Sequence, residues 1–382
     1  RQGAGPAGAT TDAAAAAALL ATNEAYVDYF IGEQAAFALV LHGGRMRLVP
    51  LSETAATVRV LVRDVLSEMD VTQSTVRDRI GRHRVSASLD SALRRLHSVL
   101  LAPIGLPADV RRLYVASDSA VSALPWAALI DPAGRYLGER VAVLAVPGAS
   151  FLPPLPDCTG ERCTARTLVA GVGRTQSTSA TADDGSPVTL LSLRYGREEL
   201  KQLSALWGER WLELSDRNGP AQPQPQGEVL PWLAQHATRI KALHVVGHGT
   251  FSRSDPVTSR LYIEPSSAPP FVTAAQLSTL DYAGLPLVMI GACESGALRG
   301  QGGGEPLGLV RAFLSGGVER VIASNWLVDD RATLMLTTKL HESLRQSVPI
   351  GEAFFAAQRE TARRYPHPYF WAAFQMHGRP ER

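Results

Sequence analysis

Two apolar runs that end in small residues constrain the fold of this chain more than any other feature. Residues 242–249 read ALHVVGHG, and residues 285–293 read LPLVMIGAC. Buried parallel strands have unbroken apolar sequences, whereas strands with one solvated face alternate. Further runs of this kind alternate with amphipathic helical patterns along the chain, as is typical of α/β proteins. The sequence therefore predicts an α/β fold with a mostly parallel sheet.

The chain is long enough, at 382 residues, for two domains or one large one. We expect a flexible lead and an Ala-rich helix over residues 1–22, and a first α/β half over 23–152. The second half of the chain follows a segment rich in Pro and polar residues, 153–166, which is predicted to be a linker, and covers 167–382. Because residue 1 is Arg rather than Met, we expect the sequence to be part of a longer protein or a processed product.

Charge and cysteine content narrow the partners and the compartment. Lys and Arg number 38 and Asp and Glu 36, so the net charge of +2 gives no reason to expect nucleic acid or an anionic membrane as the main partner. No apolar run approaches the roughly 20 residues that span a bilayer. Three cysteines, Cys158, Cys163 and Cys293, are too few for a secreted disulfide framework, so a cytoplasmic location is expected. The sequence alone does not decide whether Cys158 and Cys163 form a disulfide.

The two runs put a histidine and a cysteine at strand ends. The carboxyl ends of parallel strands meet at one edge of a sheet, so we expect His248 and Cys293 to lie side by side. An adjacent imidazole raises the thiolate fraction of a cysteine and can protonate a leaving amine. The backbone N–H groups of Gly249 and Cys293 would stabilise an oxyanion. On the residues alone, Cys293 is either a nucleophile with His248 as acid–base or a small buried hydrophobe.

Two other interpretations of these segments find no support. His244 and His248 have the spacing of a helical zinc pair, but on a strand four residues span about 13 Å, too far for one ion. The run GQGGGEPLGL at 300–309 lacks the Lys and Ser/Thr of a phosphate-binding loop. We therefore predict no metal site and interpret His244 as a structural residue of its strand.

With these blocks identified, the chain resembles the CHAT-domain proteases, bacterial members of the caspase–separase clan. That clan is marked by an apolar strand ending in His-Gly and a second ending in Ala-Cys, as in the two runs above. Downstream, GLVRAFLSGGVERVIASNWLVDD at 308–330 and HPYFWAAFQMHG at 367–378 agree. The resemblance covers residues 23–380, nearly the whole chain.

This resemblance implies a caspase-like three-layer α/β/α sandwich, preceded by a degenerate, non-catalytic pseudo-caspase-like half. It implies a cysteine endopeptidase that cleaves a protein substrate without a metal or organic cofactor, in bacterial stress or defence signalling. A regulatory protein or an appended tetratricopeptide-type domain would control it. Alternatives from other classes are a catalytically silent scaffold and a cysteine amidase or acyl hydrolase that acts on small molecules.

Carried over residue by residue, the cysteine of the family falls on Cys293 and its histidine on His248. The usual Thr before the histidine is Gly247 here, and the usual Ser before Ala-Cys is Gly291. These departures leave the dyad intact.

The Trp-x-Val-x-Asp block of the family falls on Trp326, Val328 and Asp330. Asp329 and Asp330 are candidates for the pocket that receives a basic side chain before the cleaved bond, and Glu294 is placed among the residues that line the site. An Asp at the start of a helix is also favoured by capping and by the helix dipole. Both interpretations therefore stay open for Asp329 and Asp330.

Overall fold

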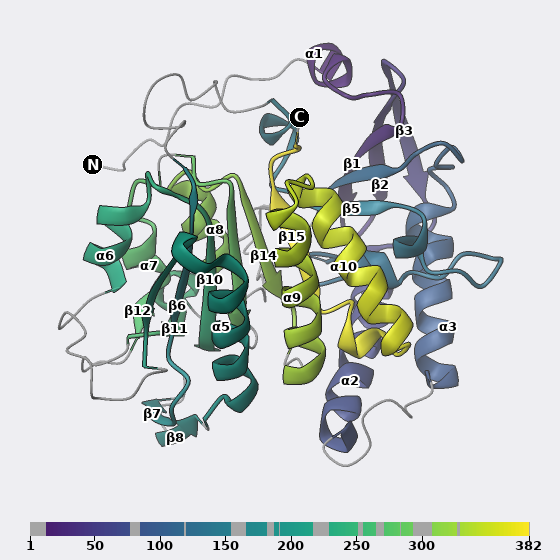
Figure 1. Cartoon of the computed structure of the whole chain (residues 1–382). Helices are drawn as coiled ribbons and strands as arrows, with labels where there is room; N and C mark the ends of the chain where they lie inside the picture. The colour runs from purple at the N-terminus through teal and green to yellow at the C-terminus, as the bar shows by residue number, and fades with distance from the viewer. Residues whose placement is uncertain are drawn as a thin grey trace. The chain divides into compact units, whose positions relative to one another are not determined.

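A computed structural model gives the arrangement of most of the chain (Figure 1). It describes residues 13–76, 85–117, 120–153, 166–181, 187–190, 192–216, 229–250, 255–264, 271–282, 284–292, 308–326 and 329–381. The described residues fall into two compact units. Unit 1 contains those of 1–154 and 362–382, and unit 2 contains those of 155–298 and 307–361.

Unit 1 is built on a mixed sheet. Its strands are β1 (Glu24–Ile31), β2 (Ala36–His42), β3 (Arg45–Leu51), β4 (Arg112–Ala116), β5 (Ala142–Val146) and β15 (Phe374–Gly378). They lie in the order β15-β5-β4-β1-β2-β3, with parallel pairing from β15 to β1 and antiparallel pairing from β1 to β3. The final strand of the chain therefore belongs to the same sheet as the first half.

The hairpin between β2 and β3 turns at Gly43 and Gly44. Their φ angles are 57° and 70°, and this left-handed backbone is open to glycine without the steric penalty of a Cβ. Three α-helices of unit 1 are α1 (Ala13–Ala18), α2 (Ala55–Val76) and α3 (Ala87–Leu96), and a π-helical segment, η1 (His97–Leu101), continues α3. Short 3₁₀ turns are η2 (Trp126–Ala128), η3 (Leu137–Glu139), η4 (Ala149–Phe151) and η7 (Pro368–Phe370).

Unit 2 is built on a parallel sheet. Its strands in spatial order are β9 (Trp211–Ser215), β6 (Leu168–Gly173), β10 (Ile240–Thr250), β13 (Leu287–Ala292) and β14 (Arg320–Ser324). Two antiparallel strands, β11 (Arg260–Tyr262) and β12 (Val272–Thr273), extend the sheet from the end of β10. A separate hairpin joins β7 (Thr178–Thr181) to β8 (Pro187–Leu190).

The helices of unit 2 cover both faces of this sheet. They are α5 (Arg194–Trp207), α6 (Val229–His236), α7 (Ala274–Leu277), α8 (Leu309–Ser315), α9 (Asp330–Arg345) and α10 (Ile350–Arg364). The last of these helices, α10, ends within unit 1. Two 3₁₀ turns, η5 (Gly208–Arg210) and η6 (Pro256–Thr258), lie between the helices in the sequence. Successive side chains of a strand point to opposite faces. On β10, Leu243 and Val245 belong to a core cluster with residues of α6, α7 and α8. His244 instead contacts α5 and α9, so the unit has three layers.

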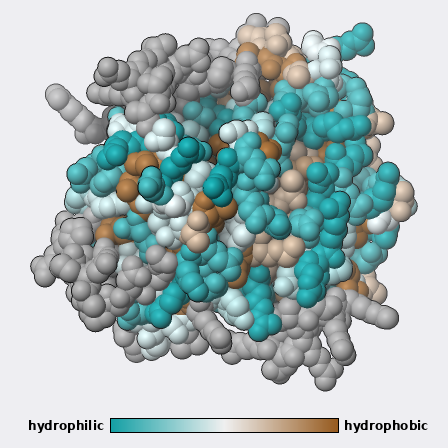
Figure 2. Space-filling model, viewed as in Figure 1, coloured by the Kyte–Doolittle hydropathy of each residue, from teal (hydrophilic) through white to brown (hydrophobic). Residues whose placement is uncertain are grey.

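This architecture confirms the predicted α/β class with a mostly parallel sheet. None of the helices in the part of the chain that the structure describes is long and apolar enough to cross a membrane. On the face drawn in Figure 2, hydrophilic residues cover most of the described surface, and apolar residues lie between them in small groups.

Candidate active site

The two sequence runs form adjacent parallel strands. β10 pairs with β13 in a continuous register from Ala242 opposite Leu287 to Gly247 opposite Ala292. His248 is the next residue along β10, and Cys293 is the next residue in sequence after β13. Cys293 itself lies outside the described residues, as do Glu294, Val328 and the cysteine pair at 158 and 163. The ladder thus confirms the expected pairing of the two strands up to the residue before Cys293.

The histidine end of the site is held by two ladders. β10 pairs with β13 up to Gly247, and from His248 to Thr250 it pairs with β11, where His248 lies opposite Tyr262 and Gly249 opposite Leu261. A Cβ at Gly247 would approach the carbonyl oxygen of Tyr262 to 2.6 Å, closer than real Cβ contacts allow. Glycine at this position therefore follows from the close approach of β11, and the backbone of the half-buried His248 is held by its pairing with β11 and by the β13 ladder that ends one residue before it.

The two aspartates at the start of α9 have different roles. Asp329 is the N-cap residue, because its Oδ1 accepts hydrogen bonds from the backbone N–H groups of Arg331 and Ala332, both at 3.0 Å. Asp330 is the first helical residue and makes no such cap. Burial, with the nearby charges of Asp329 and Glu199, raises the pKa of Asp330 to about 6. Of the two, Asp330 is the carboxylate to which the described residues bring no counter-charge.

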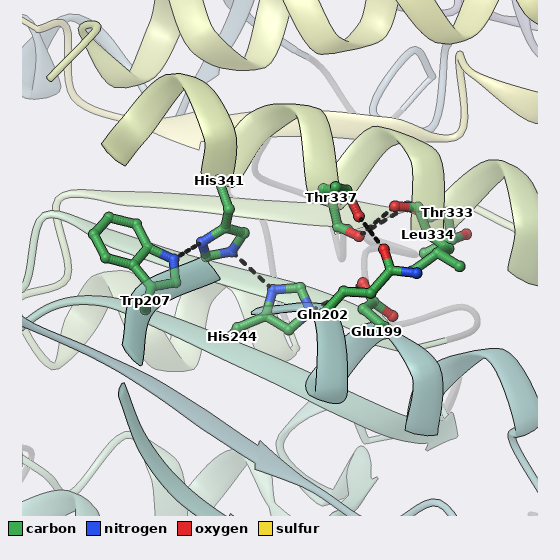
Figure 3. Close-up of polar contacts among 9 residues, drawn as sticks. Glu199, Gln202, Trp207, His244, Thr333, Leu334, Thr337 and His341 are labelled. Atoms are coloured by element: carbon green, nitrogen blue, oxygen red, sulfur yellow. Dashed lines mark hydrogen bonds and ion pairs between the residues drawn. The ribbon is translucent and has the colours of Figure 1, made fainter. Parts of the chain in front are cut away.

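A buried polar chain lies beneath these strand ends (Figure 3). The indole Nε1 of Trp207 lies 3.1 Å from Nδ1 of His341, whose Nε2 is 3.3 Å from Nδ1 of His244. Nε2 of His244 in turn lies 3.0 Å from Oε1 of Glu199. His244 has no exposed surface, and Glu199 is 3% exposed. Burial, and then the neighbouring His244 and Lys241, hold the pKa of His341 well below its ordinary value.

These residues were not among the predicted site residues, although the sequence holds a signal for one of them. On α5 the buried positions are 196, 199, 200, 203 and 207, the spacing of a helix face that packs against a core. Glu199 is the acidic member of that apolar face. His244 does lie within a buried strand, as its interpretation as a structural residue requires.

No group of three or more His, Cys, Asp or Glu side chains capable of holding a metal ion occurs among the described residues.

Comparison with known proteins identifies the class. The model of the CHAT domain family matches residues 90–379, well over half of the chain, so the chain belongs to the CHAT domain family. The search of curated proteins found no match.

Among solved structures, separase in the Saccharomyces cerevisiae separase–securin complex is similar, with a TM-score of 0.57 and 11% identity. The match covers 96% of this chain and 30% of the separase chain. The Arg-specific cysteine proteinase gingipain R matches with a TM-score of 0.41 and 11% identity, over 78% of this chain and 68% of its own. The fold is therefore shared with separase, a caspase-like cysteine peptidase, over nearly the full length of this chain and less than a third of separase.

Proposed function

We propose that this chain is a cysteine endopeptidase in which Cys293 attacks the scissile carbonyl and His248 transfers protons. The observation that carries the proposal is the β10–β13 register, in which Gly247 lies opposite Ala292. His248 and Cys293 are the residues that follow these two in the sequence. Family membership and the separase-like fold support the same chemistry.

The reaction follows from these roles. His248 takes the proton of the Cys293 thiol, and the thiolate adds to the carbonyl carbon to give a tetrahedral oxyanion. The N–H groups of Gly249 and Cys293 would stabilise this oxyanion. Its collapse breaks the C–N bond, and His248 returns the proton to the leaving amine. Water, deprotonated by His248, then hydrolyses the thioester and restores the free thiol.

Asp330 is the carboxylate that we assign to the pocket for a basic side chain before the cleaved bond. Its burial without a counter-charge among the described residues supports this role, because a Lys or Arg side chain would supply the missing cation. Asp329 is occupied as a helix cap and makes at most an indirect contribution. Glu294 remains a proposed lining residue.

A protein partner controls the activity in this proposal. The separase that shares the fold is found in complex with securin, and a regulatory protein or an attached tetratricopeptide-type domain would act on this chain in a comparable way. We further propose a bacterial, cytoplasmic setting and a role in stress or defence signalling.

Labelling with an Arg- or Lys-directed chloromethyl ketone, followed by peptide mapping, tests the dyad. We expect an adduct on Cys293 that is lost in Cys293→Ala and strongly reduced in His248→Ala. Since truncation of a nucleophile or its base removes most of the rate enhancement, peptide cleavage should fall by at least about 10³-fold in either variant.

A matched control is His236→Ala, which removes a partly exposed imidazole on α6 away from the strand ends. An adduct on Cys158 or Cys163 instead, or cleavage that survives Cys293→Ala, would overturn the proposal and favour a scaffold.

A further inference from the structure

The hydrogen bonds of the buried polar chain run in one direction. An indole N–H only donates, so Nδ1 of His341 accepts from Trp207, and the ring proton of neutral His341 sits on Nε2. That proton is donated to Nδ1 of His244, which leaves Nε2–H of His244 to donate to Glu199. Each donor is neutral. The buried polar chain of Trp207, His341 and His244 therefore orients the carboxylate of Glu199 without supplying it with a counter-charge (Figure 3).

Only one oxygen of Glu199 takes part in this buried polar chain. Oε1 accepts from His244 at 3.0 Å, while the described residues offer Oε2 no hydrogen-bond donor. Glu199 is 3% exposed, and its Oε2 is not among the fully buried side-chain atoms that lack a partner, so this oxygen stays accessible to a donor. A carboxylate that is otherwise desolvated gains from such a donor, because pairing and hydrogen bonding compensate for its burial. The free oxygen thus marks a position where a cationic donor would be bound.

Glu199 lies at the candidate active site. Both of its carboxylate oxygens are 4.0 Å from the position that a Cβ on Gly291 would take, and Gly291 precedes Cys293 by two residues. Its helix, α5, packs against α9, which begins with Asp330, and the negative charge of Glu199 acts on Asp330. A buried carboxylate and a partly buried one, from two helices that pack together, therefore interact near the site.

We propose that Glu199 is a second specificity-determining carboxylate, which together with Asp330 binds the guanidinium of an arginine before the cleaved bond. This inference rests on the proposed peptidase function and deepens it. A guanidinium presents five N–H donors in a planar fork and can serve two carboxylates at once, whereas an ammonium is a compact point charge. The site therefore prefers Arg over Lys. His244, His341 and Trp207 are positioning residues for Glu199.

Gly291 keeps the free oxygen accessible in this arrangement. A serine hydroxyl at position 291 would extend one bond beyond the Cβ position and come within hydrogen-bond distance of the Glu199 carboxylate. Gly291→Ser would then satisfy Oε2 internally and weaken arginine binding, without removing any charge from the site.

Two measurements on the full chain test this assignment. The first compares peptides that differ only in Arg, Lys or citrulline before the cleaved bond. In Glu199→Gln, we expect KM for the Arg peptide to rise by at least about 10-fold with kcat within about 3-fold, and KM for the citrulline peptide to change less than 2-fold, because only the charged side chain loses a partner. Glu198→Gln, a partly exposed neighbour on α5, is the matched control and should leave all three peptides unaffected.

The second measurement needs no catalysis. N-acetyl-arginine amide is titrated into Cys293→Ala by calorimetry, alone and combined with Glu199→Gln, Glu198→Gln or Gly291→Ser. We expect binding to be lost with Glu199→Gln, weakened with Gly291→Ser and kept with Glu198→Gln.

The outcomes separate the two proposals. If the wild type cleaves no peptide but the amide binds in a manner that depends on Glu199, the peptidase proposal fails and the guanidinium site stands. If the wild type cleaves peptides but Glu199→Gln keeps the Arg preference, or lowers kcat equally for all peptides, Glu199 has only a structural role and the inference is wrong.

Discussion

Glu24 of unit 1 and Glu199 of unit 2 are both buried, and the two differ in how their charge is satisfied. In unit 1, Oε1 of Glu24 accepts a hydrogen bond from Tyr114 at 2.6 Å and forms an ion pair with Nε of Arg112 at 3.1 Å, and Oε2 accepts from the backbone N–H of Ala21 at 2.9 Å. From the described part of unit 2, Glu199 accepts a single hydrogen bond, which comes from neutral His244. Both are below a tenth exposed. A buried charge that is fully paired serves the fold, and one for which the described residues supply a single neutral donor points to a ligand.

The sharpest way to break this comparison is to replace each glutamate by glutamine. Glu24→Gln removes the charge that pairs with Arg112 and leaves one acceptor oxygen where two are used, so we expect the free energy of unfolding to fall by about 2–3 kcal/mol. Glu199→Gln keeps an acceptor for His244 and removes an uncompensated charge, so the free energy of unfolding should stay the same or rise. Urea unfolding followed by circular dichroism measures both. Equal losses in the two variants would show that Glu199 is a structural residue like Glu24.

A second, smaller effect is expected at Asp330. Its pKa is raised to about 6 from an ordinary 3.8, so the folded protein binds this proton more tightly than the unfolded chain does. The contribution of Asp330 to stability is therefore full below about pH 4 and is lost as the pH rises through about 6. Asp330→Asn should raise the free energy of unfolding by about 1–2 kcal/mol at pH 7 to 8, since one pKa unit is worth about 1.4 kcal/mol, while arginine binding is lost.

Thermal unfolding between pH 4 and pH 8 measures this difference. It should shrink as the pH falls toward 4, because Asp330 is then protonated in the folded protein and increasingly protonated in the unfolded chain as well. A constant difference over the whole range would mean that the carboxylate of Asp330 is not destabilised by ionisation in the folded protein.

The smallest of the three effects separates the neighbouring aspartates. Asp329→Ala removes the acceptor for two backbone N–H groups of α9 and should lower the free energy of unfolding by about 1 kcal/mol. Asp329→Asn keeps an oxygen acceptor and should be nearly neutral. In chemical denaturation at pH 7, Asp329→Ala and Asp330→Asn should thus move stability in opposite directions. A shift of the same sign would contradict the division between cap and pocket.

The sequence was sufficient for the fold class because each deciding signal is local. Unbroken apolar runs predict buried parallel strands, and Gly43–Gly44 predicts a hairpin whose backbone requires glycine. The pairing of β10 with β13 could also be predicted, since one crossover joins them. A short strand such as β9, WLELS, carries a Glu and a Ser within five residues and offers no apolar run to find.

The buried polar chain could be predicted only in part. A histidine within an apolar strand requires a partner, and Glu199 on the buried face of α5 requires one too. What joins them is tertiary: His244 and His341 are 97 residues apart, and Trp207 and His341 are 134 apart. No local sequence pattern links residues that are so far apart along the chain. The distinction between Asp329 and Asp330 was likewise undecidable from sequence, because either aspartate fits a helix N-terminus.

The long strand β10 also has a consequence for hydrogen exchange. Residues 242–246 pair with β6 on one side and with β13 on the other, so their amides are enclosed within the sheet. Such amides exchange only through the larger openings of a structure. We expect them to be among the slowest in unit 2, and His248 therefore extends from the segment of the unit that opens least often.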